Sequence, residues 1–280
     1  MAGIRVVTDS ASDLPAGLAE ELGIEIVPLT IRFGDDEFVD RRDLSPSEFW
    51  ARCANSPLLP ETAAPSPGSF EDAYRRLAAA GADGIVVVSI SGDLSATGQA
   101  AELAAQAVKD VLPVQIVDSK SVSMGQGLVA VAAAKLAVAG KGMEDVVGAA
   151  IDCVPRTRVL GALDTLENLK KGGRIGGAQA FLGSMLSIKP IIEVRDGKVE
   201  PEGRQRTRSK ALAYLAEKLR EHERIETLAV LHGDAPDVDE FLDTIAGIVP
   251  RDEVIVGDIG AVIGAHSGPR IIGVAFTLPR

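Results

Sequence analysis

The chain has 280 residues, a formal net charge of −11, and a hydrophobic share of 46% with only 4% aromatic residues. That composition is typical of a well-filled α/β protein, and the length favours two medium domains over a single core. The negative charge argues against a nucleic-acid binder or a general binder of anionic membranes, since both need a basic face. We therefore expect no nucleic-acid partner and at most transient membrane contact.

Two further features of the chain bear on its compartment and chemistry. Cys53 and Cys153 lie in no metal-ligand spacing and are too few for a disulfide framework, which predicts reduced, structural thiols. The N-terminus enters a predicted strand at once, and no apolar run is long enough to cross a bilayer. We expect a soluble cytoplasmic protein without a cofactor or a metal ion.

The first half of the chain alternates predicted strands and helices. In chain order we expect a strand over 4–7, a helix over 14–22, a strand over 24–33, an exposed acidic hairpin or loop over 35–43, a helix over 45–53, a stiff proline-rich loop over 58–70, a helix over 70–80, a strand over 85–88, a helix over 100–108, a strand over 114–117, and helices over 127–139 and 143–153. Runs of Val and Ile without polar alternation indicate strands buried on both faces of a parallel sheet. Asp13 would cap the first helix and Gly23 would end it, Pro28 indicates an edge or a bend, and Trp50 is predicted to pack in the core or an interface.

The pattern changes after about residue 155. We expect strands over 158–162 and 188–194, a helical stretch over 165–171, a hairpin at 197–199, helices over 209–221 and 238–248, and strands over 227–231, 253–256 and 271–275. The hairpin signal indicates antiparallel pairing. The prediction is an α/β fold with a three-layer, parallel-sheet (Rossmann-like) domain over 1–156 and a smaller α+β domain with a mixed or antiparallel sheet over 157–280.

Hydroxyl-rich turns follow the three apolar runs of the first domain. They contribute Ser10, Ser91, Ser95, Thr97 and Ser119. Because ligands bind beyond the carboxyl ends of parallel strands, these hydroxyls are candidates for one shared pocket. No Lys or Arg occurs from residue 85 to 108, which favours a single carboxylate or a small neutral polar group over a polyphosphate. The alternative is that these residues only cap the following helix.

The reactive residues of the second domain are few. His232 and His266 are placed like site residues, whereas His222 is expected in solvent, and a hydrogen-bonded structural role is the alternative for any single histidine. The glycine-rich stretch 172–177 with Arg174 could form a phosphate-binding nest or a plain turn. The sequence contains no H-E-x-x-H, Walker A, G-x-S-x-G or complete G-x-G-x-x-G motif.

Taken together, seven segments resemble the DegV family of bacterial fatty-acid-binding proteins, and the resemblance covers essentially the whole chain. The segments are 8–14, 62–68, 90–97, 118–119, 172–175, 204–210 and 266–269. The family's usual residues are replaced here at Ala63, Ala64, Ala96, Gly98 and Arg270. The first four of these departures bear on chain-length preference and on the hydrogen bonds behind the head contacts.

The resemblance implies a long-chain fatty acid buried between the two domains. Its carboxylate would be held by Thr62 and Ser95 with His266 close by, in a hydroxyl-lined head site without cations, above an apolar tunnel. It also implies that the protein is not itself an enzyme. A separate ATP-dependent kinase would phosphorylate the bound acid, and the acyl phosphate would feed phospholipid synthesis.

Three arginines are candidates for contacts with that kinase or with the new phosphate, namely Arg174, Arg204 and Arg206, with solvated surface charge as the alternative. Two other functions stay open at this point. One is a self-sufficient enzyme that transfers phosphoryl or acyl groups with His266 and Arg174. The other is a lipid-responsive regulator with a partner that is not a kinase.

Overall fold

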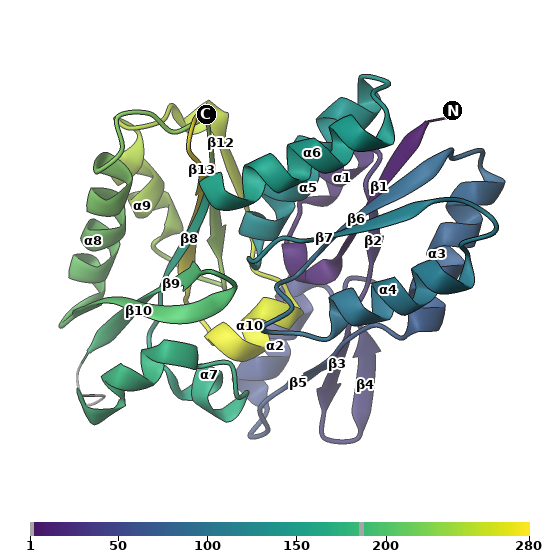
Figure 1. Cartoon of the computed structure of the whole chain (residues 1–280). Coiled ribbons are helices and arrows are strands. Elements are labelled where there is room, and N and C mark those ends of the chain that lie inside the picture. Colours follow the sequence, from purple (N-terminus) through teal and green to yellow (C-terminus); the bar gives the residue numbers. More distant parts are fainter. Residues whose placement is uncertain (1–2, 185–187) are drawn as a thin grey trace.

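The computed structural model describes residues 3–184 and 188–280. A four-stranded parallel sheet in the order β2-β1-β6-β7 forms the centre of the first half (Figure 1). Its strands are β1 (Ile4–Asp9), β2 (Glu25–Val27), β6 (Gly84–Ser89) and β7 (Val114–Asp118). Every residue of β6 is buried, as the unbroken apolar run predicts.

Helices cover both faces of this sheet and confirm the three-layer prediction. Alternate residues of β1 and β6 pack against α3 (Pro67–Ala79) and α4 (Thr97–Ala107) on one side. The residues between them pack against α1 (Ala16–Leu22), α5 (Met124–Val138) and α6 (Met143–Cys153) on the other. The period of two along each strand sends neighbouring side chains to opposite layers.

The strand predicted over 24–33 is two strands in different sheets. Pro28 separates β2, at the edge of the parallel sheet, from β3 (Thr30–Phe33), which belongs to a small antiparallel sheet in the order β4-β3-β5. The other members of that sheet are β4 (Asp36–Val39) and β5 (Glu61–Ala63). The loop predicted without regular structure therefore contains a strand, because Thr62 pairs with Ile31 of β3.

Helix α2 (Pro46–Asn55) connects the small sheet to the rest of the molecule. Ser45 and Glu48 form a capping box at its start. Trp50 on this helix is 6% exposed, and its Nε1 donates to the carbonyl of Ile259 at 3.1 Å. The predicted packing role of Trp50 is confirmed.

Six strands form a mixed sheet in the second half, in the order β10-β9-β8-β13-β11-β12. Its strands are β8 (Thr157–Ala162), β9 (Lys189–Arg195), β10 (Lys198–Gln205), β11 (Thr227–His232), β12 (Val254–Asp258) and β13 (Ile272–Thr277). Among the neighbouring strands that the structure describes in this sheet, β11 and β12 pair in parallel and the other pairs are antiparallel. Helices α8 (Arg208–Arg220) and α9 (Val238–Ile245) cover one face, and α7 (Glu167–Lys171) and α10 (Ala261–Ser267) pack on the other side.

Two helix predictions need correction. Asp13 does not cap α1, since the helix begins after Pro15 and Asp13 instead ends a 3₁₀ turn with a φ of 49°. Helix α10 was not predicted, because it spans only seven residues and its N-cap position, Gly260, offers no side-chain cap. The predicted end of α1 at Gly23 is confirmed by its left-handed φ of 61°.

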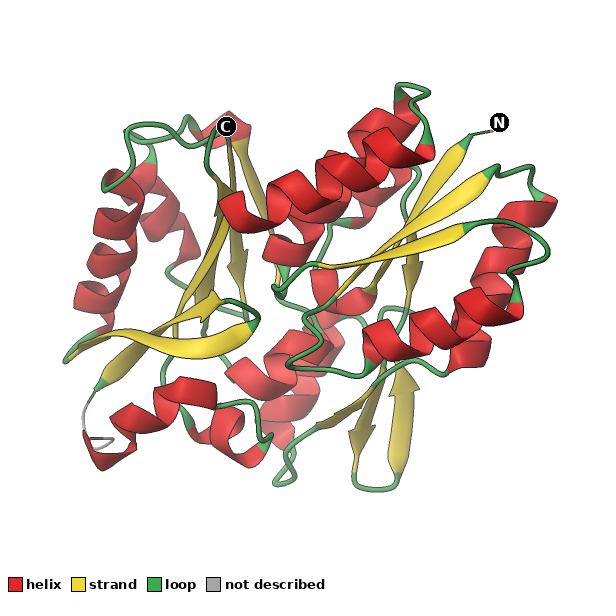
Figure 2. Ribbon diagram, in the orientation of Figure 1, coloured by secondary structure: helices red, strands yellow, loops and turns green. Residues whose placement is uncertain are grey.

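One hydrophobic core passes between the two large sheets, which Figure 2 shows with helices between and around them. It contains Val86 of the parallel sheet and Val159 and Leu231 of the mixed sheet, together with residues of α5 and α10. The parallel sheet uses only residues before 156 and the mixed sheet only residues after it. The domain division at that residue stays a prediction.

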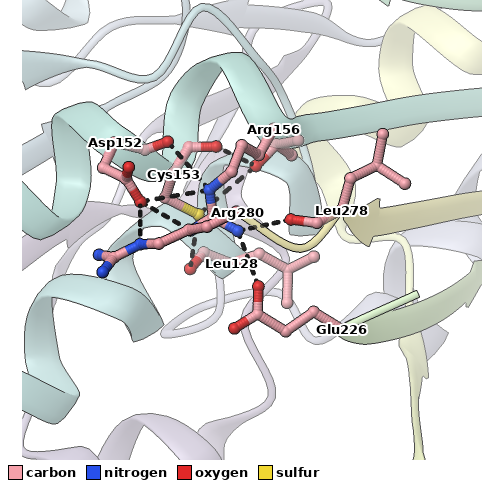
Figure 3. Close-up of polar contacts among 8 residues, drawn as sticks. Leu128, Asp152, Cys153, Arg156, Glu226, Leu278 and Arg280 are labelled. Atoms are coloured by element: carbon pink, nitrogen blue, oxygen red, sulfur yellow. Dashed lines mark hydrogen bonds and ion pairs between the residues drawn. The ribbon is translucent and has the colours of Figure 1, made fainter. Parts of the chain in front are cut away.

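An ion-pair cluster lies at this junction, where Arg156 leads into β8 (Figure 3). The guanidinium of Arg156 pairs with Asp152 at 2.9 Å and Glu226 at 2.7 Å, and donates to the carbonyl of Leu278 at 2.5 Å. Arg280 pairs with the same Asp152 carboxylate at 3.0 Å. The cluster thus connects α6 to the last residues of the chain.

Candidate functional site

A cavity of about 240 Å³ lies between the mixed sheet, helix α10 and the loops of the first domain. The floor comes from β8, β9 and β13, which contribute apolar side chains and two glycines. Six of its lining residues are polar, and they are Thr62, Ser95, Ser123, Arg174, His266 and Ser267. A mainly apolar cavity with a few polar groups is typical of a small-molecule site.

Thr62 and His266 meet at this cavity. Strand β5 carries Thr62 and α10 carries His266, and the Thr62 hydroxyl lies 3.0 Å from His266 Nε2. Burial lowers the pKa of His266 to about 4, with the nearby Arg174 guanidinium as a smaller cause. The imidazole is therefore neutral at pH 7. Its Nε2 either donates to the Thr62 hydroxyl or accepts from it.

Ser95 is held in place by the start of α4. Its hydroxyl lies 2.9 Å from the hydroxyl of Thr97 and accepts from the backbone N–H of Thr97 at 3.3 Å. Thr97 is fully buried and Ser95 is half-buried at the cavity. Thr97 therefore orients Ser95, and when its hydroxyl donates to Ser95, the Ser95 hydroxyl proton is free to point at a ligand.

Arg174 brings a positive charge to the lining of the cavity, whereas the predicted head site has no cation. The position of the head stays a prediction. Arg174 is an exposed residue that also lines the cavity, and its Nε donates to the carbonyl of Leu94 at 3.2 Å. Its Nη1 donates to the carbonyl of Gly172 at 2.7 Å. The segment around Ser95 lacks cations, but the turn after α7 supplies one from 79 positions further along the sequence.

Ser10, Ser91 and Ser119 are buried but lie outside the cavity lining. The Ser10 hydroxyl accepts from the N–H of Leu29, and the Ser119 hydroxyl accepts from the N–H of Ser121. Ser91 donates to the carbonyl of Gly197 at 2.7 Å, in the hairpin between β9 and β10. These hydroxyls complete turns, and Ser91 joins the two halves of the chain. Thr97 also lies outside the lining, behind Ser95.

The remaining predicted arginines lie elsewhere. Arg204 is near the end of β10 and Arg206 follows it, and both are exposed outside the cavity lining. Within residues 3–184 and 188–280, no group of three or more His, Cys, Asp or Glu is arranged to hold a metal ion. The helices of the same ranges include none that is long and apolar enough to span a bilayer.

Ser123 and Asp13 belong to the site, although the sequence analysis did not select them. Ser123 lines the cavity, and its hydroxyl donates to Asp13 Oδ2 at 2.6 Å. Asp13 Oδ1 accepts the N–H of Gly260, the N-cap residue of α10, at 2.9 Å. Burial raises the pKa of Asp13 to about 7. This carboxyl therefore ties the start of α5 to the helix that carries His266.

The sequence could not have revealed this role of Asp13, because Ser123 and Gly260 are far away along the chain. A weak signal exists for Ser123, whose position directly before α5 is a common place for a hydroxyl. Its φ of 50° is unusual for a residue other than glycine. From this conformation the Ser123 hydroxyl bonds to Asp13.

The fold and this site define a two-domain α/β protein with a mainly apolar cavity, and the polar lining consists of four serine or threonine hydroxyls, one neutral imidazole and one guanidinium. A family model described as "Uncharacterised protein, DegV family" matches residues 3–278. The chain belongs to the DegV family.

Relatives in sequence and in structure cover nearly the whole chain. The DegV domain-containing protein SCO2569 of Streptomyces coelicolor is 38% identical over 98% of each chain. A Thermus thermophilus DegV family protein, described as fatty acid binding, has a TM-score of 0.89 at 36% identity and covers 99% of this chain and 100% of its own. A stearic-acid-binding protein of Eubacterium ventriosum has a TM-score of 0.88 at 26% identity and covers 98% of each chain.

Proposed function

We propose that this chain binds a long-chain fatty acid, with the acyl chain in the cavity and the carboxylate at Thr62, Ser95 and His266. The observation that carries the proposal is the 3.0 Å contact between Thr62 and His266 at the lining of a mainly apolar cavity. Because every methylene of the acyl chain that leaves water contributes about 0.8 kcal/mol, the tail supplies most of the affinity. The polar residues orient the head.

The hydroxyls suit a carboxylate because each can donate to it while its own oxygen accepts from another group. In the bound state His266 Nε2–H donates to Thr62 Oγ1, and the Thr62 hydroxyl donates to one carboxylate oxygen. Thr97 donates to Ser95, and Ser95 donates to the carboxylate. Arg174 favours the ionised form of the acid through its charge.

Two relatives support this assignment. The Thermus thermophilus protein is described as fatty acid binding, and the Eubacterium ventriosum protein as binding stearic acid. The chain described here shares their fold over nearly its whole length. The substitutions at Ala63, Ala64 and Ala96 leave Thr62 and Ser95 in place beside them.

We further propose that the bound acid is presented to a separate ATP-dependent kinase. In that reaction a carboxylate oxygen attacks the γ-phosphorus of ATP, the bond to the β-phosphate oxygen breaks, and ADP leaves as the acyl phosphate forms. Arg174 is a proposed contact for the new phosphate, and this proposal is supported by its being exposed and also part of the cavity lining. Arg204 and Arg206 are proposed contacts with the kinase. The absence of nucleotide-binding motifs from the sequence supports a separate catalytic subunit.

The test of ligand binding is the mass of the purified protein under native and denaturing conditions, followed by extraction of what is released. We expect a long-chain fatty acid at about one per chain. An empty protein that takes up no added fatty acid contradicts the proposal. Turnover of ATP or an acyl ester by the chain alone would identify the self-sufficient enzyme, and capture of a specific partner without kinase activity would identify the regulator.

A further inference from the structure

Two glycines lie directly opposite each other on neighbouring strands of the cavity floor. Gly161 of β8 pairs with Gly273 of β13. On the outer sides of this pair, Ile192 of β9 is opposite Gly161 and Leu231 of β11 is opposite Gly273. All four residues line the cavity. Across the sheet, this row of the floor therefore consists of one large side chain, two positions without a side chain, and a second large side chain.

The backbone does not require glycine at either position. Neither residue is among the glycines with a left-handed φ. Glycine in the interior of a strand weakens the strand, and it often marks a place where a ligand or another backbone approaches closely. Both glycines line the cavity, so the close approach that they allow is on the cavity side of the sheet.

A Cβ fits above Gly273 with ordinary van der Waals contacts. A Cβ added there would meet no atom closer than the carbonyl oxygen of Leu160 at 3.5 Å, and the nearest side-chain atom is Ile259 Cδ1 at 4.0 Å. A Cβ added at Gly161 would meet Ile271 Cδ1 at 3.3 Å, the end of a flexible side chain. Gly273 can therefore accept a methyl group directly, and Gly161 can accept one if the end of the Ile271 side chain moves by a few tenths of an ångström. In both cases the methyl group takes its volume from the cavity side of the sheet.

The shallow region continues along β13. Ala275 is on the same face as Gly273, two residues further along the strand, and pairs with Val159 of β8. Both also line the cavity. Gly161, Gly273 and Ala275 thus form a trough in a floor that otherwise carries branched side chains.

We propose that this trough holds the acyl chain against the sheet backbone, and that Gly161 and Gly273 determine which chain lengths the protein accepts. The inference rests on the proposed function and deepens it, since it assigns the residues that select among fatty acids. An acid short enough to end before the glycine pair does not use the trough. A longer acid needs it empty.

The test is a chain-length profile of affinity for straight-chain saturated acids from octanoate to stearate, measured with the full-length protein. For wild type the affinity should rise about fourfold per added methylene. For Gly273→Val the rise should stop at the length that reaches the trough, with shorter acids bound as in wild type. Gly273→Ala should show a smaller loss of affinity that begins at the same chain length. In Gly161→Ala the rise of affinity should also stop at that length, because the two glycines are opposite each other.

The matched control is Gly148→Ala on α6, where an added Cβ meets nothing within 4 Å and which lies outside the cavity lining. It should keep the wild-type profile. Circular dichroism and thermal unfolding identify the variants that fold. If Gly273→Val does not fold, the chain-length profile of Gly273→Ala decides the test. If the folded variants had the wild-type profile, the proposed role of the trough would be wrong and the proposed function would be unaffected. A wild type that binds none of the acids would overturn both.

Discussion

The imidazole Nε2 of His266 lies 3.0 Å from the hydroxyl of Thr62, although 204 positions separate the two residues in the sequence. One residue comes from a three-residue strand and the other from a seven-residue helix. Neither element is stable alone, so the contact depends on the packing of both around the common core. The head of the candidate site is therefore a product of the complete fold.

Removing the two head hydroxyls should weaken acid binding strongly. In Thr62→Ala/Ser95→Ala, each lost hydrogen bond to a charged group is worth about 1.5 to 3 kcal/mol, so the affinity should fall by at least about 100-fold. Isothermal titration with a long-chain fatty acid measures the change, and a thermal melt checks folding. Thr244→Ala, an exposed hydroxyl on α9, is the control and should bind as wild type. An unchanged affinity in the double variant contradicts the assignment.

Binding should raise the pKa of His266 from its value of about 4 in the empty protein. A carboxylate near the ring favours the imidazolium, whereas burial and Arg174 oppose it. Because the loaded state then holds more protons, affinity should increase as pH falls toward the loaded pKa. NMR titration of the ring measures both states, with His266→Asn to assign the signal. A long-chain alcohol, which has no carboxylate, should leave the pKa of His266 unchanged. If the pKa of His266 were the same in the empty and the acid-loaded protein, the carboxylate would not lie near the ring.

Asp13 should make stability depend on pH. Burial raises its pKa from 3.8 to about 7, so between these values the folded state holds a proton that the unfolded state has lost. The contribution of Asp13 to the free energy of unfolding therefore falls as pH rises through this window, by up to about 1.4 kcal/mol per pH unit, and is constant above it. Urea unfolding of wild type and Asp13→Asn across this range measures the difference between them.

In Asp13→Asn this part of the pH dependence should be absent. The exposed Asp72→Asn is the control, and it should follow the wild-type curve. If the difference in stability between wild type and Asp13→Asn were the same at the two ends of the window, the buried carboxyl would not be the titrating group.

The two arginines of the ion-pair cluster in Figure 3 should contribute unequally to the stability of the fold. The side chain of Arg156 is 18% exposed and bonds to Asp152, Glu226 and the carbonyl of Leu278, so Arg156→Ala should cost about 1 to 3 kcal/mol of stability. The side chain of Arg280 is 75% exposed, and Arg280→Ala should change stability by less than about 0.5 kcal/mol. Urea unfolding compares them, and equal losses would contradict this ranking.

Local patterns were sufficient for the elements that are long or uniformly apolar. The three apolar runs predicted β1, β6 and β7, and the predicted helix over 143–153 agrees with α6 at both ends. Capping and glycine signals located the start of α2 and the end of α1 because those features depend on a few adjacent residues.

The rest of the site depends on contacts between distant residues. Strand β5 exists because β3 offers it backbone partners, and α10 is held from outside by Asp13. Arg174 reaches the cavity from a glycine-rich turn, and nothing in the sequence of that turn indicates which other residues it contacts. Periodicity describes what one segment does, so it indicates neither which side chains share a cavity nor that two glycines in separate strands become neighbours.

The bond between Asp13 and Gly260 also bears on how the protein is made. The two residues are 247 positions apart, and synthesis proceeds from the N-terminus at about 5 to 20 residues per second. The carboxyl of Asp13 leaves the ribosome roughly 12 to 50 s before its backbone partner does. During that interval the carboxyl of Asp13 lacks this hydrogen bond, so the loop after β1 completes its native contacts only after Gly260 has been synthesised.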